Sequence, residues 1–317
     1  MDLEARRPVG GVDYPQTYQE FRAWFADEDS CIEYLGRLRW PDGFICPRCE
    51  GTDSWRTKRR VWMCSGCGLK TSATAGTIFH RSHTPLSTWF AAMWFITAQK
   101  TGVSAAGLQE ILGFGSYETA WAWMHKLRRA MVRDDRERLS GIVEVDQSFL
   151  GGVSHGKLGA SSDKFPIMIA VERDAKERIG RIRLKVADTP SSLELVDFAR
   201  DVVVPGSTIR TDGARMFRVL GNEGYTHEYS TGYNAADRDA EMPGAHLVSS
   251  LLKRWNAGTL HYRMSAKHLP YYLDEFTFRF NRRNSKARGM LFYRLLQQAV
   301  NTDPHPLTEL IHGKSGT

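Results

Sequence analysis

The stretch from Gly141 to Gly152, GIVEVDQSFLGG, constrains the fold of this chain more than any other segment. β-branched and aromatic residues dominate it and two glycines end it, which predicts a short buried strand. Glu144 and Asp146 lie two residues apart, so both carboxylates share one face of that strand. A carboxylate on a buried strand is costly unless a cation or hydrogen-bond donors receive it. The pair therefore indicates a metal site, unless the strand lies at a sheet edge with its acids in water.

Two CxxC pairs form the most specific local motif. Cys46 and Cys49 make the first pair, Cys64 and Cys67 make the second, and 14 residues separate the two. Four thiolates at this spacing can close a tetrahedral zinc site, with each pair on a tight turn. Because all four ligands come from the protein, the pattern predicts a structural zinc in a zinc ribbon. Four unrelated cysteines or a redox pair are the alternatives.

Charge and hydropathy narrow the class of protein further. The 317 residues leave room for roughly two domains, and 42% hydrophobic residues argue against wholesale disorder. A net charge of +7 and a pI of about 9.2 favour an anionic partner, nucleic acid above all. No apolar run is long enough to span a membrane and the N-terminus lacks a signal-peptide core, so we expect a cytoplasmic protein. We interpret the fifth cysteine, Cys31, as a core residue of a short helix.

Helical patterns fill residues 81–136. We expect a buried helix from Leu86 to about Lys100, a short helix over 104–112 and, after a glycine turn, a longer helix over 116–133. The last two resemble a helix-turn-helix that would bind DNA. The alternative is a helical hairpin with a solvated basic face. Three cations of the longer helix face outward and are candidates for DNA contacts: Lys126, Arg129 and Arg133.

From residue 141 strands alternate with helices, and two further candidates for a site follow. Asp212 ends a strand over 208–211, where its carboxylate could face a cleft or could cap the next helix. His246 and Lys253 lie seven residues apart, on nearly the same face of one helix. A metal ligand and a phosphate-binding cation could lie together there, and a satisfied structural histidine is the alternative.

On a later helix Glu275 and Arg279 lie four residues apart. A surface ion pair is the ordinary explanation for that spacing.

Four segments, in this order, resemble bacterial insertion-sequence transposases of the DDE type: EVDQSFLGG, TDG, HLVSSLLKRWNAGT and KHLPYYLDEFTFRFNRR. The N-terminal RWPDGFICPRC resembles the closest group, insertion-sequence family fifteen-ninety-five, in which a zinc ribbon precedes the catalytic domain. The resemblance covers about residues 17–295. It implies an α/β catalytic domain of the ribonuclease H and retroviral integrase type that holds two divalent ions, Mg²⁺ or Mn²⁺.

The resemblance also implies which residues bind those ions. Asp146 and Asp212 match the first two acids of the family. The third position lies on a helix seven residues before a Lys or Arg, which points to His246. Relatives usually carry Glu or Asn there, and a histidine can still bind a metal, although Mg²⁺ prefers oxygen. Glu275 is the lesser candidate. Three further cations could hold phosphates: Lys253, Arg254 and Arg279.

As a whole, the resemblance implies a transposase that binds the ends of an insertion sequence and carries out metal-dependent cleavage and strand transfer. Its partners would be double-stranded DNA, as terminal inverted repeats and target, and further copies of the chain in a dimer or larger assembly on nucleoid DNA. A non-catalytic DNA-binding regulator and a nuclease that cuts without joining are the alternatives. We expect five parts: a flexible arm 1–16, helices with the zinc ribbon 17–80, a helical DNA-binding segment 81–136, the catalytic domain 141–295 and a tail 296–317.

Overall fold

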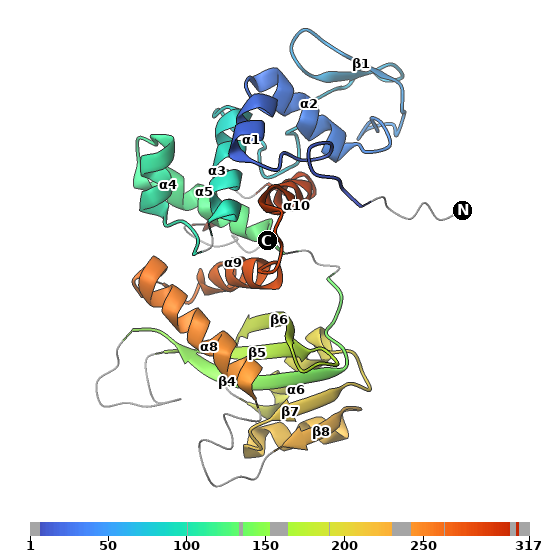
Figure 1. Ribbon diagram of the computed structural model, residues 1–317. Coiled ribbons are helices and arrows are strands. Elements are labelled where there is room, and N and C mark those ends of the chain that lie inside the picture. Colours follow the sequence, from blue (N-terminus) through green and yellow to red (C-terminus); the bar gives the residue numbers. More distant parts are fainter. Residues whose placement is uncertain are drawn as a thin grey trace. The chain divides into compact units, whose positions relative to one another are not determined.

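The chain divides into two compact units in the computed structural model (Figure 1). One unit comprises Met1–Arg133 with Ser285–Thr317, and the other comprises Asp134–Asn284. The structure describes residues 7–99, 101–132, 136–152, 164–189, 191–229, 242–262, 264–304 and 309–310. None of the helices in these ranges combines the length and apolar character that crossing a membrane requires.

A small antiparallel sheet lies in the first unit. Its strands are β1 (Ser54–Arg56), β2 (Trp62–Cys64) and β3 (Lys70–Thr71), in that order. The segment between the two CxxC pairs forms the antiparallel β1–β2 hairpin. Trp62 packs its ring against Trp40 beside this sheet, with 5.1 Å between the ring centroids.

Helices make up most of the rest of this unit. They are α1 (Tyr18–Trp24), α2 (Glu28–Arg39), α3 (Leu86–Ala98), α4 (Ala105–Leu112), α5 (Tyr117–Arg129) and α10 (Arg288–Val300). Helix α3 carries apolar residues on nearly all of its faces, and most of these residues are buried. Its Trp89 ring stacks on the ring of Trp123 in α5, with 3.5 Å between the centroids. Since α3 has no side-chain cap of its own, the Glu28 carboxylate accepts the N–H groups of Leu86 and Ser87, at 2.8 and 3.3 Å.

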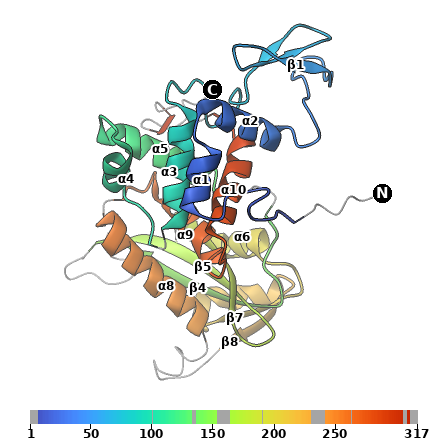
Figure 2. The ribbon, with the colours of Figure 1, turned by 45° about the horizontal axis from the view of Figure 1, so that its top comes forward.

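Helix α10 differs from the sequence prediction, which divided it between a catalytic domain ending at 295 and a tail. It lies beside α3 in the first unit, as Figures 1 and 2 both show in red and teal. Leu291, Phe292 and Leu295 are buried at helical spacing along one stripe. Phe292 meets Phe21 of α1 edge-on, with centroids 5.4 Å apart. The C-terminal segment therefore completes the core of the N-terminal helices.

Residues 7–16, expected to belong to a flexible arm, are anchored on this core through Tyr14 and Pro15; residues 1–6 lie outside the described ranges. The Tyr34 hydroxyl donates to the carbonyl oxygen of Asp13 at 2.6 Å. Tyr14 is 5% exposed and its ring lies 5.8 Å from that of Tyr293. Tyr14, which precedes Pro15, therefore anchors the segment. A prediction from helical periodicity does not detect this contact, because the segment has no helical period.

A five-stranded sheet forms the centre of the second unit, in the order β6-β5-β4-β7-β8. Its strands are β4 (Ile142–Leu150), β5 (Phe165–Arg173), β6 (Ile179–Val186), β7 (Thr208–Thr211) and β8 (Thr226–Tyr229). β4, β5 and β6 pair antiparallel, whereas β7 and β8 run parallel to β4. The stretch 141–152 thus forms the central strand, which excludes the sheet-edge alternative.

Helices cover both faces of this sheet. On one face, α6 (Ser192–Val202) and the 3-10 helix η2 (Arg215–Asn222) bury an apolar core that includes Val143, Val145 and Ile209. On the other face, α8 (Pro243–Trp255) and α9 (Leu269–Asn281) bury a second core with Ile169 and Val171. Figure 1 shows α8, in orange, lying across the strands. This order of strands and layers is ribonuclease H-like and confirms the predicted fold class.

Side chains at the end of α9 and just beyond it form hydrogen bonds with the backbone of the outer strand β6. The Asn281 amide accepts the N–H of Ile182 at 2.7 Å and donates to the carbonyl of the same residue at 3.2 Å. Arg283 donates to the carbonyls of Ile179 and Gly180. These bonds satisfy backbone groups that an edge strand otherwise leaves open to another chain.

Gly289 of α10 allows us to test the packing of the N-terminal segment. A Cβ atom there would lie 1.6 Å from the carbonyl oxygen of Pro15. We expect Gly289→Ala to lower the free energy of unfolding by about 3 kcal/mol, because the clash outweighs the gain in helix propensity. Urea unfolding followed by tryptophan fluorescence measures this, since every tryptophan except Trp255 lies in the first unit.

Gly107→Ala in α4 is the matched control. Its Cβ would meet only ordinary contacts, the nearest at 3.4 Å from the Ser104 hydroxyl, so stability should stay equal or rise slightly. Equal stability of Gly289→Ala and the wild type would contradict the packing of residues 7–16 on α10.

Candidate active site and metal centre

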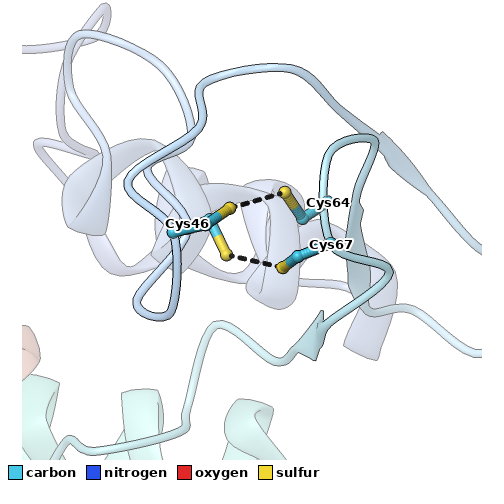
Figure 3. Close-up of side chains that lie close together, drawn as sticks. Cys46, Cys64 and Cys67 are labelled. Atoms are coloured by element: carbon cyan, nitrogen blue, oxygen red, sulfur yellow. Dashed lines mark hydrogen bonds between the residues drawn. The ribbon is translucent and has the colours of Figure 1, made fainter.

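The four cysteines of the CxxC pairs converge in space (Figure 3). The sulfur of Cys46 lies 3.6 Å from that of Cys67, and the sulfur of Cys49 lies 3.6 Å from that of Cys64. A tetrahedral zinc with Zn–S bonds of about 2.3 Å separates its sulfurs by about 3.8 Å, so the spacing fits that ion.

The two turns that carry these cysteines have the same construction. Glu50 N–H donates to the carbonyl of Cys46, and Gly68 N–H donates to the carbonyl of Cys64, both at 3.0 Å. Glu50 and Gly68 have φ angles of 60° and 67°. Both turns therefore end in the left-handed region, which a glycine supplies in the second turn and Glu50 in the first. Cys31 lies apart in α2, and burial raises the pKa of its thiol to about 12, as suits a core residue.

The parallel register of β4 and β7 brings two of the predicted acids together. Glu144 pairs with Arg210, so two residues further along each strand Asp146 lies beside Asp212, just beyond the end of β7. Burial raises the pKa of Asp146 to about 6, and the Asp212 charge adds to this effect. The N–H of Gln147 and the charges of His246 and Lys253 act in the opposite direction.

Asp212 lies in an ordered turn rather than at a helix cap. Its Oδ1 accepts the N–H of Ala214 at 2.9 Å, and Gly213 has a φ of 74°. The buried hydroxyl of Thr211 accepts the N–H of Gly213 at 3.2 Å and lies 2.9 Å from Nε2 of His227 on β8. Helix η2 begins after this turn without a side-chain cap bond. The carboxylate is thus held at the end of its strand.

His246 lies on the same side of the sheet as the two acids. Its Nε2 is 3.8 Å from Oδ2 of Asp146, too far for a hydrogen bond but within reach of a shared cation. Lys253, two turns further along α8, is exposed and its charge lowers the pKa of Asp146. Among the described residues only the cysteines form a group of three or more metal-binding side chains whose ligand atoms all lie within 4.8 Å of one another. The set of Asp146, Asp212 and His246 is therefore wider.

Glu144 shares the face of Asp146, as predicted, but its carboxylate has partners within the protein. The side chain is 1% exposed and lies 3.1 Å from the guanidinium of Arg173. Its other oxygen accepts the N–H of Ala245 at 2.7 Å, at the start of α8. Burial raises the pKa of Glu144, and these two partners oppose that shift.

Glu275 is ion-paired with Arg279 at 2.8 Å, as the spacing predicts, but the pair is not on the surface. Glu275 is fully buried and Arg279 is 12% exposed. Arg279 also lies over the ring of Trp255 at the end of α8, with its guanidinium carbon 5.9 Å from the ring centroid.

The predicted DNA contacts fall into three groups. Lys253 and Arg254 are exposed at the end of α8. Lys126 and Arg129 of α5 are partly exposed, and burial lowers the pKa of Lys126. Arg133 lies outside the described residues, and Arg279 is engaged by Glu275 in the interior.

Two family models match the chain. The ISXO2-like transposase domain matches residues 138–281 and the transposase zinc-ribbon domain matches residues 26–70, so together they span more than half of the chain. No curated protein matches it. Among solved structures the chain is similar to the catalytic core domain of BIV integrase, with 15% identity and a TM-score of 0.29 over 46% of this chain and 85% of that chain.

The raised pKa of Asp146 predicts how the metal-free protein responds to pH. Its ordinary value is 3.8, so ionisation of the buried carboxyl lowers the stability of the folded state as pH rises from about 4 to about 6. The loss, on the order of 2–3 kcal/mol, then persists at higher pH. We expect Asp146→Asn to raise the free energy of unfolding by this amount at pH 7.5 in a chelator, and by far less at pH 4. Urea unfolding followed by circular dichroism measures both.

Asp201→Asn is the control, because this carboxylate is 66% exposed and should change stability by less than about 0.5 kcal/mol at either pH. If Asp146→Asn is no more stable than the wild type at pH 7.5, the result would contradict the claim that ionised Asp146 destabilises the folded protein.

Proposed function

We propose, from the premise that this chain belongs to the IS1595 family of insertion-sequence transposases, that it cuts DNA at the ends of an insertion sequence and joins those ends to target DNA. The observation that carries the proposal is the alignment of Asp146 with Asp212 across β4 and β7, beside His246 of α8. A regulator without catalysis has no need of two acids that oppose one another in a partly buried position.

These residues suit a divalent cation. The burial of Asp146 and the neighbouring charge of Asp212 outweigh the compensating groups, which leaves a site that favours a cation. Carboxylate oxygens are the ligands that Mg²⁺ and Mn²⁺ prefer. We assign two such ions to Asp146 and Asp212, with the His246 ring as a third ligand. When bound, the ions would supply Lewis acids that activate the attacking oxygen and stabilise the leaving oxygen of a phosphodiester.

The protein's own groups prepare this chemistry. Asp146 has to be ionised to bind a cation, which its pKa of about 6 allows at neutral pH. Lys253 and Arg254 present exposed positive charge at the end of α8, where they can hold DNA phosphates near the acids. The ordered turn around Gly213 keeps the Asp212 carboxylate at the strand end.

The first unit supplies recognition in this proposal. The four cysteines bind one structural Zn²⁺ that holds the β1–β2 hairpin, and the α4–α5 pair with Lys126 and Arg129 contacts the terminal inverted repeats. Since two element ends have to be joined, the active form is a dimer or larger assembly on double-stranded DNA in the bacterial nucleoid.

The zinc assignment predicts a stoichiometry. Purified protein should contain about one zinc per chain, and Cys64→Ser should lose it together with the fold of the ribbon, because a structural site needs all four thiolates. Cys31→Ala, which changes the cysteine outside the cluster, should keep the zinc. Metal analysis by mass spectrometry decides the matter, and full zinc content in Cys64→Ser would exclude the four-cysteine site.

Strand transfer of a labelled, pre-cut element end into a plasmid tests the catalytic proposal. We expect Mg²⁺- or Mn²⁺-dependent joining by the wild type, lowered by about 100-fold or more in Asp146→Ala, Asp212→Ala and His246→Ala. Asp201→Ala, at an exposed acid of the same unit, should retain activity.

Glu275→Gln separates the two candidates for the third ligand, because glutamine preserves much of the buried packing around Arg279. Retained activity in this variant is expected. Activity lost in Glu275→Gln but kept in His246→Ala would move the third ligand to α9. Binding of genuine ends without cutting or joining would favour the non-catalytic regulator, and cutting without joining would favour a nuclease.

A further inference from the structure

The start of α8 is held by a buried ion pair between the strands β4 and β5 beneath it. The helix has no side-chain cap of its own, and Pro243 occupies its first turn. The Glu144 carboxylate instead accepts the N–H of Ala245 at 2.7 Å while it contacts Arg173 at 3.1 Å. Both side chains are almost wholly buried, at 1% and 8% exposure. A strand residue thus caps a helix that follows it by about a hundred positions.

Gly244 allows this close approach. A Cβ atom at this position would lie 2.8 Å from Oε2 of Glu144, 2.8 Å from Nη1 of Arg173 and 3.1 Å from Cγ1 of Val171. Any side chain would therefore displace either the ion pair or the helix start. Glycine is required here by space rather than by a positive φ.

A second polar contact holds the same helix one turn later. The hydroxyls of Ser148 and Ser249 lie 2.7 Å apart, and both side chains are buried. Glu144, Asp146 and Ser148 alternate along one face of β4, so the two contacts lie on either side of Asp146. Between them α8 carries His246, whose Nε2 lies 3.8 Å from Asp146.

The energetics favour a role in register over a role in stability. A buried ion pair gains little over apolar side chains of similar volume, because desolvation offsets the attraction. The apolar face of α8, with Ala245, Val248 and Leu252, supplies burial but little directional preference along the strand. Hydrogen bonds and the ion pair accept a single register.

We propose that Glu144, with Arg173, is a positioning residue that fixes the register of α8 on β4 and so holds His246 against Asp146. Its catalytic consequence rests on the proposed function, but the register itself does not. Glu144 touches neither DNA nor cation in this proposal and acts through α8.

The side-chain NMR signals of His246 in metal-free full-length protein test the register without DNA or metal. Histidine labelled with ¹⁵N, with His246 assigned through His246→Gln, gives its ring shifts at fixed pH. When Asp146→Asn is introduced into the wild-type protein, the ring shifts of His246 should change. When it is introduced into Glu144→Met/Arg173→Met, which keeps the side-chain volume but removes the charges, the change in these shifts should be at least about threefold smaller. Val248→Ala, which weakens the apolar packing of α8 alone, should keep the full response.

Strand transfer is the second readout. We expect the double methionine variant to fold, as circular dichroism would show, yet to join DNA about 10- to 100-fold more slowly, because small displacements of reacting groups are costly. Val248→Ala should stay within about threefold of the wild type. If the double variant does not fold, Gly244→Ala and Glu144→Gln test the same contacts from the helix and from the strand.

An undiminished response of His246 to Asp146→Asn without the ion pair would overturn the proposal, as would the absence of that response in the wild type. Lack of joining by the wild type would contradict the proposed function but leave the NMR result on register valid.

Discussion

The parallel pairing of β4 with β7 is the contact on which the second unit depends. Ile142, Val143 and Glu144 pair with Thr208, Ile209 and Arg210, and this register alone aligns Asp146 with Asp212. A slip of one residue would turn the acids toward α6 and Val145 toward α8. The buried Val143, Val145 and Ile209 oppose such a slip, because each would leave the apolar core beneath α6.

The two faces of β4 therefore perform different tasks. One face is apolar and fixes the strand in the sheet, whereas the other carries Glu144, Asp146 and Ser148 beneath α8. Glu144 and Ser148 have hydrogen-bond partners within the protein, at the start of α8 and at Ser249. Burial raises the pKa of both carboxyls, Glu144 and Asp146, but Glu144 has the guanidinium of Arg173 beside it. The raised pKa of Asp146 is the expected state of a carboxylate whose natural partner is a cation. Stability is lowered at one position so that charge is available there.

Local patterns predicted much of this architecture. The alternation in 141–152, the CxxC spacing and the helical periods were confirmed because each depends on neighbours in the sequence. Contacts between distant segments could not be read in this way. The capping of α8 by Glu144, the packing of residues 7–16 and the buried state of Glu275 all depend on which elements meet. Helix α10 differs from the prediction for another reason. Its apolar stripe of Leu291, Phe292 and Leu295 is visible in the sequence, but the predicted domain boundary at residue 295 divides the helix between the catalytic domain and the tail.

Anomalous diffraction from crystals grown with Mn²⁺ and a DNA end would test the central claim most directly. The account predicts manganese peaks at the carboxylates of Asp146 and Asp212, with the His246 ring within bonding distance of one of them. Manganese at Glu275, or none beside Asp146 while DNA is bound, would contradict it.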